Sequence, residues 1–232
     1  MARLKSLEGR HVLVTGAAGG IGSAVARTMF LEEGANIVLT DRNAEGLREL
    51  AKELEANPAR REGSRVVVET ADLSSGEEID RLVERLRGER IDVLVNNAGI
   101  VHAGPFESMD PGTIDRILAV NLLAVVRLTR GLVSRLRENR GGHIVNIASG
   151  AGLFGPGGLA AYAAAKFGVV GFSQSLRAEL AAEEIGVSVV CPGYVRTRIV
   201  ANSLLAGAPA RPDRFPPGEG GPPPPSPRIG SL

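Results

Sequence analysis

Short hydrophobic runs and longer amphipathic segments alternate along most of the chain. The runs are rich in Val and Ile and almost continuously apolar, which is typical of parallel strands buried on both faces of a sheet. Six runs have this character: HVLVTG from residue 11, NIVLTD from 36, RVVVETAD from 65, IDVLVNNAG from 91, GHIVNIAS from 142 and GVSVVCPG from 186. The segments between them have a helical period, at about 20–33, 44–56, 77–87, 111–138 and 160–183. The pattern predicts an α/β fold with a doubly wound parallel sheet.

The start of the fourth helix and the end of the alternation are both marked in the sequence. Asp110 before Pro111 predicts an N-cap followed by proline at the first helical position. The alternation stops near Ala206, and nine of the 14 prolines follow from residue 209 onward. We therefore expect one dinucleotide-binding and catalytic domain over 1–206 and a disordered Pro/Gly-rich tail over 207–232. A linker or a proline-rich ligand for an aromatic groove is the alternative for this tail.

Composition excludes several classes of function. The chain has 27 basic and 26 acidic side chains and no dense basic run, so nucleic acid is not an expected partner. No long apolar segment precedes the first glycines, which argues against a signal peptide or a membrane span. Cys191 is the single cysteine and cannot form an internal disulfide, so we expect a cytoplasmic protein. His11, His102 and His143 lie too far apart in sequence for a metal site, and we expect none.

The segment TGAAGGIG, residues 15–22, follows the first strand and opens the first helix. In this context Gly16 permits a tight turn, Gly20 lets the backbone approach a pyrophosphate, and Gly22 lets the helix pack close to the sheet. The free N–H groups at the helix start favour a phosphate. A merely structural turn is the alternative, but the position at strand one favours a dinucleotide site.

Asp41 ends the second strand about 20 residues beyond these glycines. There a carboxylate accepts hydrogen bonds from the adenosine ribose hydroxyls and repels a 2′-phosphate, which favours NAD over NADP. Gly19 provides no basic partner for that phosphate, whereas Arg42 could provide one or form a surface ion pair. We therefore expect NAD, with NADP possible.

Tyr162 and Lys166 lie four positions apart in the alanine-rich run AAYAAAKFG, so they share one face of the predicted helix. A free tyrosine has a pKa of about 10, and a nearby ammonium lowers it toward the range of a useful acid or base. Spacing alone equally allows a core aromatic residue and a lysine that reaches solvent.

From about residue 7 to 197 the chain resembles the short-chain dehydrogenase/reductase family, whose motifs occur in order. The matching segments are TGAAGGIG, ADL at 71–73, NNAG at 96–99, VNL at 120–122, NIAS at 146–149, YAAAK at 162–166 and CPGYVRT at 191–197. The resemblance implies a Rossmann fold. It implies cofactor contacts from Thr15, Gly16, Gly20, Ile21, Gly22, Asp41, Arg42, Asp72, Leu73, Asn96, Asn97, Ala98, Gly99, Tyr162, Lys166, Pro192, Gly193, Val195 and Thr197.

The same resemblance implies the catalytic residues Asn121, Ser149, Tyr162 and Lys166. Tyr162 would be the general acid or base for the substrate oxygen, and Ser149 would hydrogen-bond that oxygen. Lys166 would bind the nicotinamide ribose and lower the pKa of the tyrosine, while the backbone carbonyl of Asn121 would hold a water in a proton relay. The implied reaction is hydride transfer between the cofactor and a secondary alcohol or ketone.

Structural roles remain open for some of these residues. Ser149 could be a turn residue, Asn121 a buried amide satisfied within its helix, and Asp72 a helix cap. Asn96 and Asn97 could also bond backbone across the sheet, beside the cofactor. The loop GAGLFGPGGLAA after Ser149 suggests an apolar substrate wall but does not identify the substrate.

The C-terminal sequence departs from the family pattern, because the usual seventh strand is not recognisable after Ala206. An alternative function is therefore a cofactor-binding scaffold with weak or no turnover. The resemblance implies a homodimer or homotetramer acting on a small-molecule alcohol or carbonyl compound.

Overall fold

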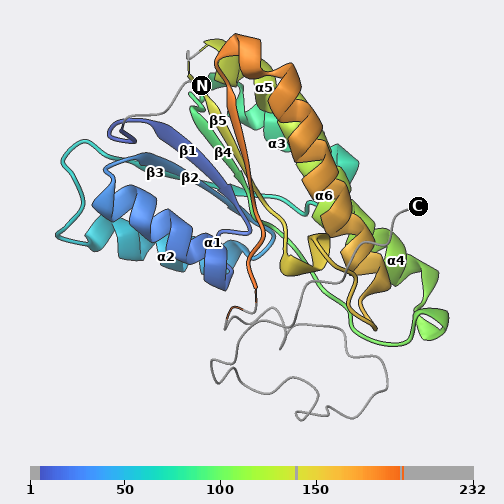
Figure 1. Ribbon diagram of the computed structural model, residues 1–232. Helices are drawn as coiled ribbons and strands as arrows, with labels where there is room; N and C mark the ends of the chain where they lie inside the picture. The colour runs from blue at the N-terminus through green and yellow to red at the C-terminus, as the bar shows by residue number, and fades with distance from the viewer. Residues whose placement is uncertain (1–5, 139–140, 194, 196–232) are drawn as a thin grey trace, which may run out of the picture.

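The computed structural model describes residues 6–138, 141–193 and 195, which form one parallel sheet covered by helices. The strands are β1 (His11–Thr15), β2 (Asn36–Asp41), β3 (Val66–Thr70), β4 (Val93–Asn96), β5 (His143–Ile147) and β6 (Gly186–Val190). Their order is β3-β2-β1-β4-β5-β6, and every neighbouring pair is parallel (Figure 1). The doubly wound sheet predicted from the hydrophobic runs is confirmed. Connections reverse direction between β1 and β4, and such a reversal opens a crevice at the carboxyl ends of the strands.

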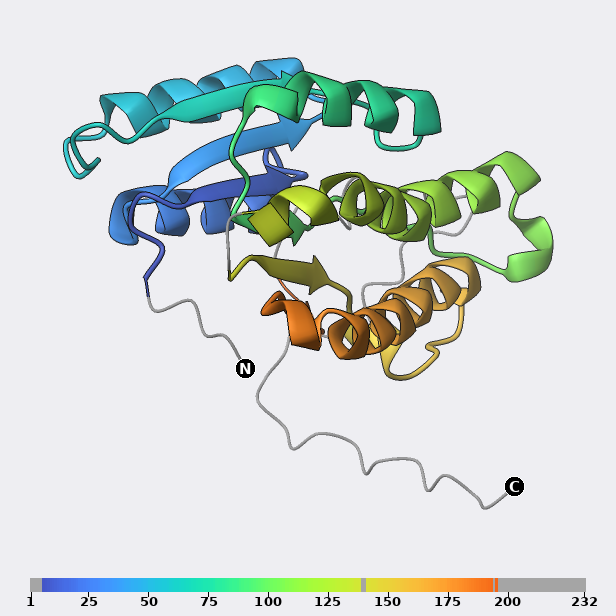
Figure 2. The same cartoon turned by 90° about the horizontal axis from the view of Figure 1, so that it is seen from above.

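The described residues form six α-helices, which lie within the predicted segments to within one residue, and five of them cover the two faces of the sheet. The six are α1 (Gly20–Arg27), α2 (Ala44–Ala56), α3 (Gly76–Arg85), α4 (Pro111–Leu118), α5 (Ala124–Glu138) and α6 (Ala160–Glu179). Helices α1 and α2 pack on one face, and α3, α5 and α6 pack on the other (Figures 1 and 2). Each face has its own apolar core, so strands buried on both sides read as continuous apolar runs.

The structure differs from the predicted continuous helices at several places. A π-helical segment, η1 (Thr28–Glu32), follows α1, and a second, η4 (Ala119–Leu123), joins α4 to α5. Short 3₁₀ turns, η2 (Leu86–Gly88) and η6 (Ala181–Glu183), follow α3 and α6, and two more lie in loops, η3 (Phe106–Ser108) and η5 (Gly150–Gly152). A π-helical turn keeps the same side-chain period to within one residue, so hydrophobic periodicity does not reveal it.

The predicted N-cap at Asp110 is confirmed, since its carboxylate accepts the backbone N–H groups of Gly112 at 2.9 Å and Thr113 at 3.0 Å. The helical stretch that begins there, Pro111–Glu138, is long and apolar enough to cross a membrane by length and composition. Buried residues of α5, among them Leu128 and Leu132, belong to the apolar core against the sheet. The apolar pattern is therefore explained by a core helix.

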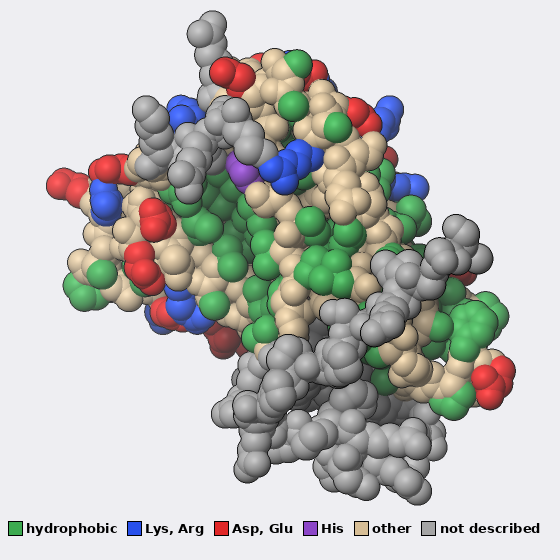
Figure 3. Space-filling model, viewed as in Figure 1, with side chains coloured by type: hydrophobic (Ala, Val, Ile, Leu, Met, Phe, Trp, Pro, Cys, Tyr) green, Lys and Arg blue, Asp and Glu red, His purple; other side chains and the backbone are tan. Residues whose placement is uncertain are grey.

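Strand β6 forms one edge of the described sheet. Figure 3 shows hydrophobic side chains between the α1–α2 layer and β6, and Val190 at the end of β6 is 44% exposed. The predicted tail over 207–232, and residues 196–206 of the predicted domain, lie outside the described residues.

Candidate active site

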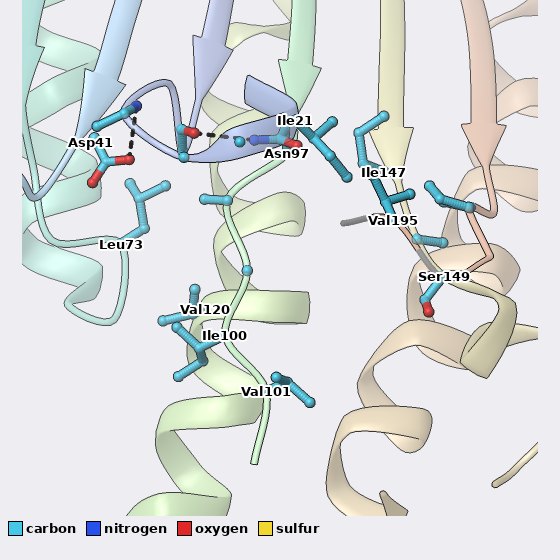
Figure 4. Close-up of a pocket in the computed structure, with 18 of the residues that line it drawn as sticks. Ile21, Asp41, Leu73, Asn97, Ile100, Val101, Val120, Ile147, Ser149 and Val195 are labelled. Atoms are coloured by element: carbon cyan, nitrogen blue, oxygen red, sulfur yellow. Dashed lines mark hydrogen bonds between the residues drawn. The ribbon is translucent and has the colours of Figure 1, made fainter. Parts of the chain in front are cut away.

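A cleft of about 410 Å³ lies at the carboxyl ends of the strands, where the loops after all six strands meet the start of α6. Figure 4 shows this cleft with side chains from the β1, β2, β4 and β5 loops facing it. Most of the residues predicted from the sequence line it, namely Gly16, Gly20, Ile21, Asp41, Arg42, Asp72, Leu73, Asn97, Ala98, Gly99, Ser149, Tyr162, Lys166, Pro192, Gly193 and Val195.

Other predicted residues stand behind the cleft or outside the described part of the chain. Thr15, Gly22, Asn96 and Asn121 are not among the lining residues, and they support the lining from below. Thr197 lies outside the described residues. The first four differ from the prediction because a sequence motif does not reveal which side chain faces the cleft and which faces the core. That depends on strand alternation and burial.

The glycine-rich turn after β1 leaves no room for a side chain at Gly16 or Gly22. Gly16 has a φ of +65°, and a Cβ added to it would lie 2.8 Å from the Cα of Ala98. A Cβ on Gly22 would lie 2.2 Å from the carbonyl oxygen of Gly16, so α1 packs directly on the turn. Gly19 is the N-cap of α1 and has no side chain to cap the first-turn N–H groups. This cradle of backbone donors at a positive helix end fits the pyrophosphate of a dinucleotide.

Thr15 and Asn97 lock this turn to β4. The Thr15 hydroxyl accepts the backbone N–H groups of Asn97 at 2.9 Å and Ala98 at 3.1 Å. In return the amide of Asn97 donates to the carbonyls of Thr15 at 2.9 Å and Gly16 at 3.2 Å (Figure 4). Asn97 thus bonds backbone across the sheet beside the cleft, as one of the open interpretations of the sequence suggested. The same interpretation is wrong for Asn96, whose amide donates to the side chains of Thr129 and Asn146.

Asp41 and Arg42 form the outer end of the cleft after β2. The carboxylate of Asp41 accepts the N–H groups of Ala18 at 3.2 Å and Asn43 at 3.0 Å, which fixes it beside the glycine-rich turn (Figure 4). Among the described residues, Arg42 makes no ion pair, so the surface salt bridge considered for it is not found there.

Asp72 lies at the same end, in the loop after β3. Its carboxylate accepts the backbone N–H of Ser74 at 2.9 Å and the Ser74 hydroxyl at 2.7 Å. Burial raises the pKa of Asp72, but these hydrogen bonds and the charges of Arg116 and Arg42 outweigh it and hold the pKa below its usual value. The N-cap of α3 is Ser75, so Asp72 shapes the loop and does not cap the helix.

Tyr162 and Lys166 occupy the inner end of the cleft, together with Ser149. Helix α6 brings them onto one face, and the ammonium of Lys166 lies 5.7 Å from the centre of the Tyr162 ring. Lys166 is only 4% exposed, and its Nζ donates to the carbonyl of Ile147 at 2.9 Å. The lysine does not reach solvent, which excludes the solvated lysine that spacing alone allowed.

Burial dominates the electrostatics of this inner end. It lowers the pKa of Lys166 to about 8, with a smaller opposing effect from the nearby Cys191. It also raises the pKa of Tyr162, while a hydrogen bond with Ser149 opposes the rise. The protein alone therefore holds the phenol neutral, and the expected lowering of the Tyr162 pKa by Lys166 is not found, because burial and Ser149 are the groups that shift this pKa.

Asn121 lies in the π-helical segment η4 and is fully buried. Its amide donates to the carbonyls of Ile100 at 2.8 Å and Ile117 at 2.9 Å, so only one of these bonds is within its own helix. Its Oδ1 is buried with no partner among the described residues. A Cβ on Gly99 would lie 2.8 Å from this oxygen and 3.6 Å from Nζ of Lys166, so both polar atoms border Gly99.

Sequence reasoning missed the apolar walls of the cleft and one backbone acceptor. Ile100, Val101, Val120 and Ile147 line the cleft (Figure 4). Val120 and Ile147 lie inside the recognised motifs VNL and NIAS, and Ile100 and Val101 follow NNAG, so membership of or adjacency to a motif is the only signal that could have found them. The carbonyl of Ile147 that holds Lys166 has no side-chain signal at all. No three His, Cys, Asp or Glu side chains gather as a possible metal site in the described part of the chain.

A family model described as short chain dehydrogenase matches residues 10–206, which include every described segment of the cleft. The chain belongs to this family. It is thus an oxidoreductase of the short-chain dehydrogenase/reductase type, as the ordered motifs predicted.

Similar proteins are found among both curated sequences and solved structures. Nodulation protein G of Rhizobium sp. (strain N33) is 39% identical over 214 residues, 88% of this chain and 84% of that protein. The 3-oxoacyl-[acyl-carrier-protein] reductase FabG of Escherichia coli (strain K12) is 37% identical over 207 residues, 87% of this chain and 81% of that protein. A crystal structure of a putative NAD(P) dependent gluconate 5-dehydrogenase from Beutenbergia cavernae, with NADP bound at low occupancy, has a TM-score of 0.78 at 38% identity. It covers 84% of this chain and 76% of that one.

Proposed function

We propose that this chain interconverts a secondary alcohol and a ketone with NAD(H), and that Tyr162 is its general acid or base. The observation that carries the proposal is the meeting of Ser149, Tyr162 and a buried Lys166 at the inner end of a cleft whose outer end is a dinucleotide cradle. A phenol, a hydroxyl and an ammonium in one desolvated place suit proton exchange with a substrate oxygen.

The outer end of the cleft holds the dinucleotide. The first-turn N–H groups of α1 bind the pyrophosphate, and Asp41 receives the adenosine ribose hydroxyls. A 2′-phosphate would bring nearly two further negative charges to the fixed carboxylate of Asp41, so NAD(H) is preferred. Arg42 makes no ion pair in the described part of the chain, so its charge is available to a 2′-phosphate. NADP(H) therefore also binds, but more weakly than NAD(H).

The bound cofactor supplies or accepts the hydride. Tyr162 gives its hydroxyl proton to the substrate oxygen in the direction of reduction and takes it back in the direction of oxidation. Ser149 donates a hydrogen bond to the same oxygen and steadies the charge that develops on it. Lys166, with a pKa of about 8, is mostly protonated at pH 7, and its positive charge favours the tyrosinate form once Tyr162 has given up its proton.

Two further groups complete the site. The backbone carbonyl of Asn121 holds a water that passes protons between the Lys166 side and solvent, and the π-helical turn at η4 provides the irregular helix geometry for it. Lys166 also hydrogen-bonds the nicotinamide ribose, so it contributes to cofactor binding as well as to proton transfer.

The substrate side of the cleft is apolar, with Ile100 and Val101 in its wall and Leu153 and Phe154 exposed beyond Ser149. This lining suits an uncharged carbon skeleton around the reacting carbon. The names of two similar proteins, a 3-oxoacyl-[acyl-carrier-protein] reductase and a putative gluconate 5-dehydrogenase, refer to the same type of reacting group. We therefore propose that this chain also acts on a secondary alcohol or a ketone.

Assembly into a homodimer or homotetramer, and a cytoplasmic location, are part of the same proposal. Leu123 of η4 and Phe167 of α6 are 48% and 45% exposed, on helices that lie side by side (Figure 2). Exposed apolar residues of this size on adjacent helices suit a contact with a second copy. Size-exclusion chromatography with light scattering tests this assembly.

The experiment that tests the function is a panel of secondary alcohols and ketones, assayed with both cofactors by nicotinamide absorbance. Turnover of at least one substrate, with NAD(H) more effective than NADP(H), is the expected result. Tight NADH binding without turnover of any substrate would instead favour the second candidate, a cofactor-binding scaffold. That candidate is not favoured, because every described catalytic position holds the residue that the chemistry needs.

A further inference from the structure

A chain of buried polar side chains crosses the core beneath the inner end of the cleft. Asn96 of β4 donates from Nδ2 to Oδ1 of Asn146 on β5 at 2.9 Å and to the hydroxyl of Thr129 on α5 at 3.2 Å. Asn146 in turn donates from Nδ2 to the hydroxyl of Ser173 on α6 at 2.9 Å. All four side chains are at most 3% exposed. The network therefore joins two strands and two helices inside an otherwise apolar core.

The orientation of these bonds is fixed by the acceptors. The Ser173 hydroxyl donates to the carbonyl of Val169 at 2.6 Å, so its oxygen is left to accept from Asn146. Asn96 and Asn146 are register partners on neighbouring strands, which brings their amides face to face. Directional bonds fix both the height and the rotation of a helix, whereas apolar contacts tolerate sliding and rotation more readily.

The same short stretch of β5 carries the network and the inner end of the cleft. Asn146 holds Ser173, the next carbonyl, that of Ile147, holds Nζ of Lys166 at 2.9 Å, and Ser149 follows two residues later. On α6, Lys166 and Ser173 are two turns apart on the same face. Helix α6 is thus bonded to β5 at two points, and Tyr162 lies one turn beyond the first of them.

We propose that Asn146 and Ser173 are positioning residues that fix α6 against β5, so that the Tyr162 hydroxyl stays beside Ser149 at the inner end of the cleft. The inference rests on the proposed role of Tyr162. Ser149 and Tyr162 sit on two different elements, so their contact depends on how α6 lies on β5. Within α6, the spacing of Tyr162 from Lys166 is set by the helix itself and does not need the network.

The test uses a spectroscopic property of the sequence. The chain has two tyrosines, Tyr162 and Tyr194, so a Tyr194→Phe background leaves Tyr162 as the single tyrosine. With tyrosine labelled by carbon-13 at Cζ, one resonance reports the hydrogen bonding of the Tyr162 hydroxyl at neutral pH and its ionisation on alkaline titration. Ser173→Ala removes the hydroxyl that Asn146 holds. Ser175→Ala is the matched control on the same helix, since its hydroxyl bonds only to Glu179 at the surface.

Ser173→Ala is expected to move the neutral-pH resonance toward that of free tyrosine. It should raise the pKa of Tyr162, because the interaction with Ser149 that opposes the effect of burial is weakened. The pH profile of kcat should shift in the same direction, and NADH affinity should stay within about twofold of the control. Ser175→Ala should change none of these.

An unchanged resonance and pKa of Tyr162 in Ser173→Ala would overturn the proposal, even where the unfolding free energy falls, because a merely structural network would affect stability alone. The resonance is measured without substrate. Failure of the proposed function would appear separately, as absence of turnover in the unmodified protein.

Discussion

The two ends of the cleft present different chemical groups. At the outer end, the turn after β1 and the loops after β2 and β3 present backbone N–H groups and carboxylates that are at least partly exposed. At the inner end, α6 and the loop after β5 present a phenol and an ammonium that are 9% and 4% exposed. The comparison teaches that binding here depends on close backbone packing, whereas reactivity depends on polar groups held out of water.

The inner end also carries unfavourable burial of polar groups. Lys166 is desolvated enough to lower its pKa to about 8, and Oδ1 of Asn121 and of Asn96 are buried with no partner among the described residues. Such groups reduce stability and are tolerated where they serve chemistry. Changes at the outer end should therefore alter affinity, and changes at the inner end should alter turnover and the pH dependence of stability.

The largest effect on affinity is expected from Gly22→Ala. The added Cβ would lie 2.2 Å from the Gly16 carbonyl oxygen, so α1 must move away from the phosphate cradle. A lost hydrogen bond to the charged pyrophosphate costs about 1.5–3 kcal/mol, so NADH affinity measured by nicotinamide fluorescence should fall about 10- to 100-fold. Gly171→Ala, a helical glycine with no atom within 4 Å of its added Cβ, is the control and should bind normally. Normal NADH binding by Gly22→Ala would show that cofactor binding does not depend on the close packing of α1 on the glycine-rich turn.

A smaller effect, on stability, is expected from Lys166→Met. The lysine has a pKa of 10.5 in the unfolded chain and about 8 in the folded one, so between these values the unfolded state binds more protons. The unfolding free energy of the unmodified protein should therefore rise with pH over this window, by about 3 kcal/mol relative to Lys166→Met. Urea unfolding from pH 7 to pH 11 measures it. Lys52→Met, at an exposed site on α2, should stay parallel to the unmodified protein. Parallel curves for Lys166→Met as well would mean that Lys166 is not desolvated.

The smallest effect is expected from Asp41→Ala. Removing the carboxylate removes the acceptor for the N–H of Ala18, so NADH affinity falls. It also relieves the repulsion of a 2′-phosphate, so NADPH affinity changes little or rises. The preference for NADH should narrow about tenfold, measured by fluorescence titration with both cofactors. Asp80→Ala, an exposed carboxylate on α3, should leave the preference unchanged. Equal affinities in the unmodified protein would contradict the role of Asp41.

The fold was predictable because its signals are local. Continuous Val and Ile runs revealed β1 and β2, and Asp110 before Pro111 revealed the start of α4 to the residue. The outer end of the cleft was predictable for the same reason, since Gly16 and Asp41 act through their place beside a strand end. At the inner end, only the identities of the motif residues were predictable, and not their orientations or contacts. That Asn96 faces the core, that the carbonyl of Ile147 holds Lys166, and that η4 is π-helical are tertiary facts with no local signal.

The account is tested most directly by measuring kcat and NADH affinity side by side for the unmodified protein and Tyr162→Phe. The substitution removes only the hydroxyl that exchanges a proton, and general acid–base assistance contributes about 10²–10⁴-fold. The account predicts a fall of kcat by about this factor with NADH affinity unchanged within about twofold. A Tyr162→Phe variant that keeps more than about a tenth of the turnover, or that loses NADH affinity along with it, would contradict the separation of binding from reaction.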